Sequence, residues 1–140
     1  MAPFPVSVLM NPSFNILVID DDPIRAVPLL EMGHRVFLAH GFDQVKFYLQ
    51  NAKKIGIDFI CLDHDMPAMN GTEILNNFDL EMVQFPIWIW SWNVEKAAEM
   101  KNHLQELKDS MGLSAPVWGR THESGKDFME WAIAKTMGIR

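Results

Sequence analysis

Short apolar runs alternate along this chain with longer segments in which apolar residues recur every three or four positions. The apolar runs span Asn15 to Asp20, His34 to Ala39, Asp58 to Asp63, Pro86 to Ser91 and Ala115 to Gly119. Runs of this length without polar alternation are typical of strands that are buried on both faces of a sheet. We therefore expect five strands.

The segments between the runs have helical periodicity. Asp22 and Pro23 predict the first helix, with Asp22 as its cap and Pro23 in its first position, and Pro28 predicts a kink or an early end. Further helices are expected over 43–53, 72–79, 93–111 and 126–137. The apolar residues expected to be at least partly buried on these helices are Val45, Phe47, Tyr48, Leu49, Ile74, Leu75, Phe78, Ala97, Met100, Leu104, Leu107, Phe128, Trp131 and Ile133.

This order of strands and helices predicts an α/β fold with a parallel sheet and helices on both faces. Right-handed crossovers leave few topologies for five such units, and the flavodoxin-like strand order 2-1-3-4-5 is the natural one. The first and third strands are then neighbours. Their carboxyl ends meet at the edge of the sheet where ligands bind in this architecture.

The length of 140 residues fits one domain, which we assign to residues 15–140 after an N-terminal extension over 1–14. The extension is interrupted by Pro3, Pro5 and Pro12 and lacks a basic start, so it does not resemble a signal peptide. It either packs on the domain or stays loose. No stretch of the sequence is long and apolar enough to predict a membrane span.

Charge and cysteine content restrict the function classes further. A formal net charge of -6 argues against extended nucleic-acid binding, because proteins of that class usually gather Lys and Arg on one face. The single cysteine, Cys61, cannot form an internal disulfide and lies within an apolar run, so we expect a small core residue. A cytoplasmic location follows as the expectation.

Acidic residues end the first and third predicted strands. Asp20, Asp21 and Asp22 follow the first strand, and Asp63 and Asp65 flank the end of the third. Like charges at adjoining strand ends repel, and a hard divalent cation relieves that repulsion. Oxygen donors without a Cys or His cluster favour Mg²⁺ or Mn²⁺ over zinc. For Asp22 we prefer the alternative role of a helix cap, whereas metal binding is preferred for Asp20, Asp21 and Asp63.

Two stretches of this sequence resemble the receiver domain of bacterial response regulators. They are ILVIDDDP at residues 16–23 and LDHDMPAMNGTE at residues 62–73, and the resemblance spans about residues 15–137. It implies that Asp20, Asp21 and Asp63 hold Mg²⁺ together with the backbone carbonyl of Asp65, that Asp63 is the phosphoacceptor, and that Ser91 senses the phosphoryl group. Receiver domains also carry a lysine after strand five. This chain has Gly119 to His122 there, with Arg120 or Lys126 as candidate substitutes.

The sequence around Leu62 to Asp65 and the Ser91-Trp92-Asn93 turn look like the cyclic-phosphate processing receiver group. That resemblance implies a metal-dependent cyclic phosphodiesterase with Asp63 and His64 as catalytic residues. A histidine titrates near neutral pH and can serve as acid or base. Ser91, Asn93 and Trp92 would then bind the phosphate-bearing ligand.

Each of these ligand-binding assignments has a structural alternative. His64 is then a surface histidine, Ser91 an ordinary hydroxyl at a strand end, Asn93 a helix cap, and the tryptophans of strand four are packing residues.

Three functions follow for a stand-alone receiver-fold protein. The first is metal-dependent processing or recognition of a small phosphate-bearing ligand, such as a cyclic nucleotide phosphate. The second, from another class, is a phosphoacceptor in a His-Asp phosphorelay with Asp63 modified and a protein as partner. The third is a degenerate receiver that acts as a protein-binding module.

Overall fold

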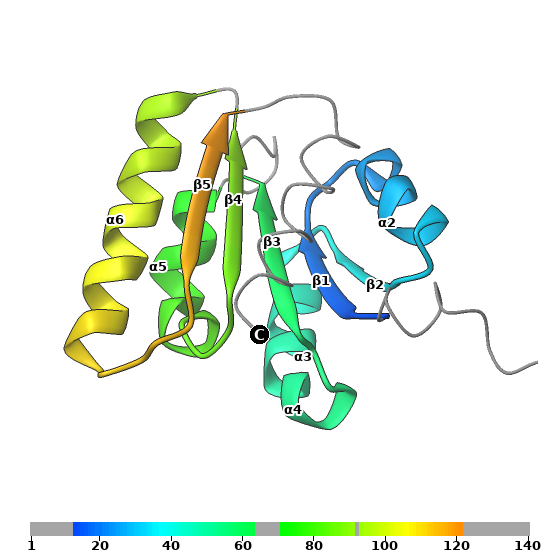
Figure 1. Cartoon of the computed structure of the whole chain (residues 1–140), viewed down its shortest axis with the longest axis horizontal. Helices are drawn as coiled ribbons and strands as arrows, with labels where there is room; N and C mark the ends of the chain where they lie inside the picture. The colour runs from blue at the N-terminus through cyan, green and yellow to red at the C-terminus, as the bar shows by residue number, and fades with distance from the viewer. Residues whose placement is uncertain (1–12, 64–70, 92, 122–140) are drawn as a thin grey trace, which may run out of the picture.

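The computed structural model describes residues 13–63, 71–91 and 93–121 of the chain. Its strands are β1 (Asn15–Ile19), β2 (Arg35–Ala39), β3 (Phe59–Asp63), β4 (Ile87–Ser91) and β5 (Val117–Thr121). All neighbouring pairs are parallel, and the order is β2-β1-β3-β4-β5 (Figure 1). The predicted fold class and strand order are therefore confirmed, and β1 lies beside β3.

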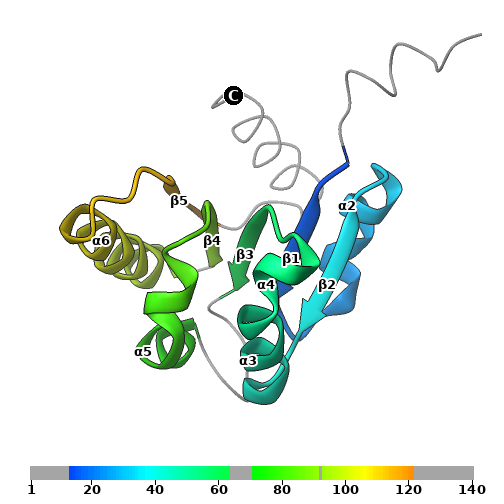
Figure 2. The ribbon, with the colours of Figure 1, turned by 90° about the horizontal axis from the view of Figure 1, so that it is seen from below.

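Helices lie on both faces of the sheet. The helical elements are η1 (Pro23–Ala26), α2 (Val27–Glu31), α3 (Phe42–Gln50), α4 (Ala52–Ile55), α5 (Gly71–Met82) and α6 (Val94–Ser110). Helices α3 to α6 cover one face, and α2 packs on the opposite face beside β1 and β2 (Figure 2). The helix expected over 126–137 lies outside the described residues. In the described part of the chain, no helix has the length and apolar character needed to cross a membrane.

Alternating side chains of the strands build two hydrophobic clusters, one on each side of the sheet. Leu17, Ile19, Ile60, Leu62, Ile87 and Ile89 face α3 to α6, whereas Ile16, Val18, Phe59, Cys61 and Trp88 face the other way. Because side chains on both faces of the sheet are buried, the strands appear in the sequence as continuous apolar runs. The Trp88 ring stacks on Trp118 with ring centres 4.8 Å apart, which confirms packing as its role.

The first helical segment contains the interruption that Pro28 predicted, but not for the expected reason. The chain changes from 3-10 geometry in η1 to α geometry at Val27, and α2 ends at Glu31. Pro28 lies in the first turn of α2, where a missing N–H removes no helical hydrogen bond. The proline therefore helps to start α2.

The helix expected over 43–53 is divided at Asn51 into α3 and α4. Val45 and Leu49 are buried as predicted, but the expected burial of Phe47 is wrong, because its side chain is 57% exposed. Positions 45 and 49 lie on one side of the helix, and position 47 points about 200° away from 45. Helix α5 extends beyond the predicted range 72–79 and ends at Met82, which is fully buried.

Strand β5 lies two residues further along the chain than the predicted range 115–119. It ends at Thr121, which pairs with Ser91, so Arg120 belongs to the strand and not to the following loop. Ala115 lies before the strand, which begins at Val117, and its carbonyl accepts a hydrogen bond from the Lys108 side chain. The correction moves Arg120 toward the acidic ends of the sheet.

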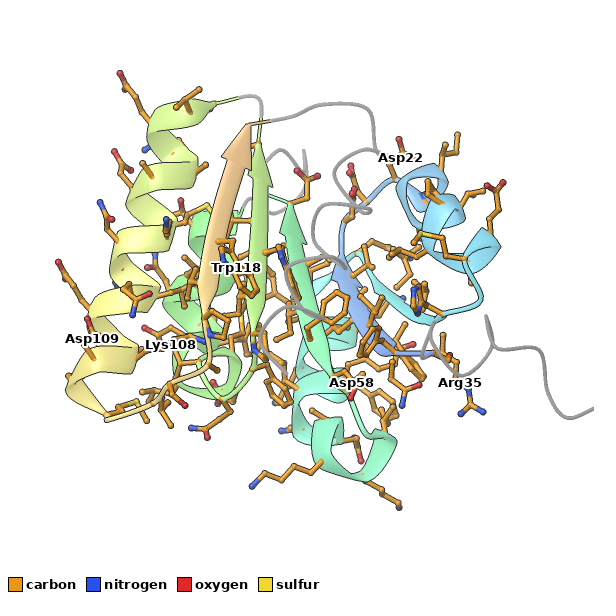
Figure 3. The ribbon with its side chains drawn as sticks, viewed as in Figure 1. Asp22, Arg35, Asp58, Lys108, Asp109 and Trp118 are labelled. Carbon is orange, nitrogen blue, oxygen red and sulfur yellow. The ribbon has the colours of Figure 1, made fainter. Side chains whose placement is uncertain are left out.

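Lys108 is a buried cation at the opposite end of the sheet from Asp22 (Figure 3). Its Nζ donates to the carbonyl oxygens of Phe85 at 2.6 Å and Ala115 at 2.8 Å, which ties α6 to the segments that precede β4 and β5. Burial disfavours the charged ammonium and lowers the pKa of Lys108 from 10.5 to about 8.

Because the pKa of Lys108 is lowered in the folded state, we expect the free energy of unfolding to rise with pH in the alkaline range. Between about pH 8 and 10 the unfolded chain binds more protons at this group than the folded chain, so deprotonation favours folding. We expect the free energy of unfolding of the wild type to rise by about 1–3 kcal/mol relative to Lys108→Met over this interval. Urea unfolding at several pH values measures the difference. Parallel pH profiles for the two proteins would contradict the prediction, whatever the absolute cost of losing the two hydrogen bonds.

Candidate metal centre

Three carboxylates meet where β1 and β3 end. Asp20 and Asp21 directly follow β1, and Asp63 is the last residue of β3. The pairing of Ile19 with Leu62 brings these ends together, and one carboxylate oxygen from each aspartate lies within 4.8 Å of the others. Asp20 and Asp63 are buried, whereas Asp21 is exposed. The cluster therefore opens to solvent on the Asp21 side.

Local hydrogen bonds fix the loop that carries the first two acids. The Asp20 N–H donates to the carbonyl of Ala39 on β2 at 3.0 Å, which extends the sheet by one residue. The Asp22 N–H donates to Asp20 Oδ1 at 2.9 Å, and Asp22 Oδ1 accepts from the Ile24 N–H at 3.0 Å. Asp22 is thus the cap of η1, as predicted, and lies outside the carboxylate cluster.

The electrostatics of the cluster favour a cation. Two like charges 4.8 Å apart repel by about 3 kcal/mol at an effective dielectric constant near 20. Three carboxylate oxygens form a hard donor set that fits Mg²⁺ or Mn²⁺. Burial, followed by the nearby Asp20 carboxylate, raises the pKa of the Cys61 thiol. Cys61 therefore stays protonated and is not a candidate ligand.

Ser91 and Asn93 follow at the carboxyl end of β4, the next strand after β3. Ser91 is buried, and its Oγ accepts a hydrogen bond from the Asn93 N–H at 2.9 Å. Asn93 Oδ1 accepts from the Lys96 N–H at 3.1 Å, so Asn93 is the predicted cap of α6. The proposed contacts of Ser91 and Asn93 with a phosphate remain predictions.

Several predicted site residues fall outside the part of the chain that the structure describes. They are His64, Asp65, Trp92 and Lys126. Their assignments as acid or base, metal ligand, stacking residue and substitute cation therefore stay predictions.

Arg120 is the residue whose position sequence reasoning missed. Asp63 pairs with Trp90 on β4, and Trp90 pairs with Arg120 on β5, so the three residues form one row across the sheet. At about 4.8 Å per strand, the Asp63 and Arg120 backbones are separated by about 10 Å. The sequence named Arg120 as a candidate cation, but the predicted strand ended before it.

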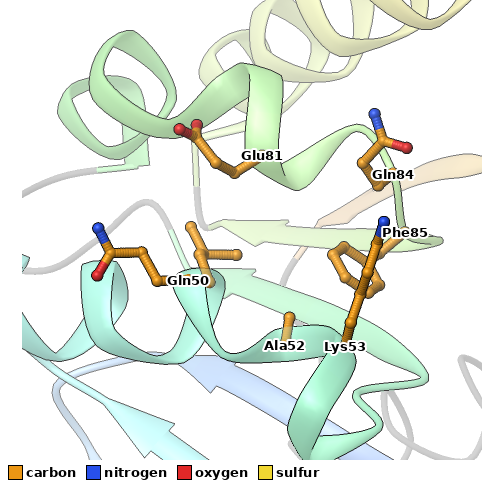
Figure 4. A pocket seen from close by; sticks show the side chains of 7 residues that line it. Gln50, Ala52, Lys53, Glu81, Gln84 and Phe85 are labelled. Atoms are coloured by element: carbon orange, nitrogen blue, oxygen red, sulfur yellow. The ribbon is translucent and has the colours of Figure 1, made fainter.

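Two hollows elsewhere on the molecule are separate from this cluster. One, of about 240 Å³, lies between α3–α4 and α5, where Gln50 and Lys53 face Glu81 and Gln84 (Figure 4). The other, of about 190 Å³, lies between α5 and α6 and includes His103, whose Nε2 is 2.9 Å from Asp79 Oδ2. Neither hollow includes a residue of the carboxylate cluster.

Comparison with solved structures shows the fold. A response regulator receiver domain protein from Clostridium thermocellum has a TM-score of 0.63 at 18% identity, with 89% of this chain and 94% of that chain covered. CheY4 of Vibrio cholerae, a chemotaxis protein, gives 0.62 at 20% identity, covering 89% and 99%. The beryllofluoride-activated NtrC4 receiver domain dimer gives 0.58 at 14% identity, covering 90% and 98%.

The chain therefore has the response-regulator receiver fold, as the sequence resemblance implied. No family model matches the chain, and no curated protein matches its sequence. The more specific resemblance, to the cyclic-phosphate processing group, finds no support in these comparisons.

Proposed function

We propose that this chain is a metal-dependent phosphoacceptor, in which Asp63 takes a phosphoryl group from a phosphorylated donor. The observation that supports the proposal is the cluster of Asp20, Asp21 and Asp63 at the ends of neighbouring strands in a receiver fold. Under this proposal Asp20, Asp21 and Asp63 hold Mg²⁺ or Mn²⁺. The bound ion supplies positive charge that offsets the negative charge of the incoming phosphoryl oxygens.

Asp63 is the best placed of the three acids to act as the nucleophile. It ends the central strand β3, and on the neighbouring strand β4 it pairs with Trp90, which precedes Ser91 and pairs with Arg120. Asp20 and Asp21 follow β1, on the other side of β3. In the proposed step an Asp63 carboxylate oxygen forms a bond to phosphorus. The bond from phosphorus to the donor atom breaks, and the leaving group keeps the electron pair. Under this proposal the Ser91 hydroxyl, at the end of the neighbouring strand β4, donates to a phosphoryl oxygen.

Charge balance indicates that a further cation is needed. Phosphorylation replaces the single charge of Asp63 by roughly two, so the site would carry about four negative charges against two from a divalent ion. Arg120 lies in the Asp63 row two strands away, with about 10 Å between the two backbones. We therefore assign Arg120 as the cation that stabilises the phosphorylated state.

Loss of this cation is expected to slow phosphorylation. We expect Arg120→Ala to lower the rate of phosphorylation by acetyl phosphate by about tenfold or more, and Arg120→Lys to restore most of it, since the charge is kept. Lys96→Ala is the matched control, because Lys96 is an exposed cation in the first turn of α6 paired with Glu99. Intact mass measured over time gives the rates. Equal phosphorylation rates for Arg120→Ala and Lys96→Ala would contradict the assignment of Arg120 as the stabilising cation.

The function itself is tested with acetyl phosphate as donor. Incubation with Mg²⁺ should give a single phosphoryl adduct in the intact mass, and neutral hydroxylamine should remove it, because an acyl phosphate reacts with this nucleophile. A chelator should prevent its formation. The absence of an adduct with acetyl phosphate, and of any Mg²⁺-dependent binding of beryllofluoride, would contradict the phosphoacceptor role.

Processing of a cyclic phosphate remains a separate prediction from the sequence. It depends on His64, which lies outside the described residues, and the Asn93 amide oxygen already caps α6. Phosphorus NMR of a cyclic nucleotide incubated with the protein and Mn²⁺ tests it. Turnover that is lost in His64→Ala would favour this activity over phosphoryl acceptance.

A further inference from the structure

Three large apolar side chains form an exposed stripe along η1 and α2. Ile24 is 73% exposed, Val27 41% and Leu30 54%, and they follow one another at intervals of three residues. On the inner side, Ala26 and Leu29 are buried against the sheet. The apolar stripe, defined as Ile24, Val27 and Leu30, is therefore a second apolar side of this helical segment, and no described residue covers it.

We propose that the N-terminal segment of this chain, residues 1–12, docks along the apolar stripe. The described chain begins at Ser13, whose Oγ donates to the carbonyl of Gly33 at 2.9 Å. The Phe14 N–H donates to His34 Nδ1 at 3.0 Å, and the buried Phe14 ring stacks on the His34 ring. These contacts fix the start of β1 beside the turn that ends α2, so the segment joins the domain next to the stripe.

The composition of the segment matches the surface. Residues 1–12 contain no Asp, Glu, Lys or Arg, and Phe4, Val6, Val8 and Met10 occupy alternate positions. Alternate residues of an extended chain point to the same side, about 6.6 Å apart. The prolines of the segment disfavour a helix and favour extended backbone. An extended segment would thus present a continuous apolar row.

The dimensions of the two rows are compatible. From Ile24 to Leu30 the stripe runs for about 10 Å, given the rise per residue of 3-10 and α-helices. Its side chains repeat about every 4.5–6 Å along the axis, against about 6.6 Å for alternate residues of an extended strand, so two or three members of the apolar row can contact the stripe. Twelve extended residues reach up to about 40 Å, which is more than the stripe requires. The segment can therefore run from the Gly33 turn back toward η1 without strain.

A tethered segment is favoured over a second copy as the occupant. Attachment at Ser13 keeps the segment at a high effective concentration near the stripe. Association of two copies would bring together two chains that each carry a formal net charge of -6. A protein partner that binds this side of α2 would have to displace the segment. The proposal does not depend on the phosphoacceptor role.

A spin label on the segment tests the proposal in the full chain. Ser7→Cys places a thiol between two members of the apolar row, and the only native cysteine, Cys61, is buried with a raised pKa and does not compete for the label. In a ¹⁵N-labelled sample we expect strong paramagnetic broadening of the amide signals of η1 and α2 and none for α6. An absence of broadening in η1 and α2 overturns the proposal.

Matched variants and a mixing experiment remove the alternatives. Ile24→Ser combined with Leu30→Ser should abolish the broadening, whereas Leu80→Ser should leave it unchanged, because Leu80 is equally exposed, at 58%, but lies on α5. Loss of the broadening in Leu80→Ser as well would contradict a specific site. Mixing spin-labelled ¹⁴N protein with unlabelled ¹⁵N protein reports contacts between chains. If the η1 and α2 signals broaden in that mixture, a second copy is the occupant and the proposal fails.

Discussion

Asp63→Asn is expected to abolish the phosphoryl adduct formed from acetyl phosphate and Mg²⁺. The substitution keeps the size and shape of the side chain, but an amide lacks the anionic oxygen that attacks phosphorus. Asp63 is also fully buried at the end of β3, whereas Asp20 and Asp21 follow β1, so the other two acids cannot take its place without a movement of the β1 loop. The expected result is complete loss rather than a reduced rate.

The neighbouring acids provide graded controls for this experiment. Asp20→Asn and Asp21→Asn should slow adduct formation by weakening metal binding, and higher Mg²⁺ should recover part of the rate. Asp22→Asn should leave the rate close to that of the wild type, because Asp22 caps η1 and an asparagine caps a helix equally well. An adduct of normal yield in Asp63→Asn, or loss of the adduct in Asp22→Asn, would contradict the assignment of the nucleophile.

Much of this site could be predicted from the sequence because the residues that end a strand are visible in its apolar pattern. The runs that become β1 and β3 stop at aspartates, and the 2-1-3-4-5 order makes those strands neighbours. Asp20, Asp21 and Asp63 therefore had to approach one another at one edge of the sheet. The caps at Asp22 and Asn93 were equally local, since each depends on a side chain and a backbone N–H two or three residues away.

The end of β5 could not be predicted in this way because it depends on contacts between distant residues. The Lys108 side chain on α6 donates to the Ala115 carbonyl. The pairing of β5 with β4 continues to Thr121. Gly119 has low strand propensity, so the local pattern favoured an end at that residue. The exposure of Phe47 is a different case, because helical spacing from Val45 and Leu49 already places position 47 on the outer side of the helix.

The position of Arg120 shows how this error affected the functional interpretation. A strand that ended at Gly119 would leave Arg120 in a loop, where its distance from Asp63 is undefined. In the observed register the Asp63, Trp90 and Arg120 backbones share a row. The register therefore places the Arg120 backbone at a defined position relative to Asp63, and the role of Arg120 as the cation of the site stays a prediction.

Asp20→Asn is expected to be more stable than the wild type without Mg²⁺ and less stable than the wild type with Mg²⁺. Without metal, three carboxylates within 4.8 Å of one another destabilise the folded state, and removal of one charge should raise the free energy of unfolding by about 1–3 kcal/mol. The asparagine Oδ1 can still accept from the Asp22 N–H. With Mg²⁺ at about a hundred times the dissociation constant, the wild type should gain about 2.7 kcal/mol, whereas the variant should gain little. The variant is then more stable than the wild type in a chelator and less stable in Mg²⁺.

Urea unfolding in a chelator and in Mg²⁺ at matched ionic strength measures this crossing. Asp58→Asn is the control, because Asp58 lies just before β3 at the other end of the strand and its Oδ2 accepts from the Asn15 N–H at 2.7 Å (Figure 3). The Asp58→Asn substitution should change stability by the same amount in both conditions, since Asp58 is not part of the carboxylate cluster. A general effect of the salt would change the free energy of unfolding of the wild type and of both variants by the same amount. If Asp20→Asn and the wild type keep the same order with and without Mg²⁺, the carboxylate cluster is not a metal site, and a metal-dependent phosphoryl transfer at Asp63 loses its physical basis.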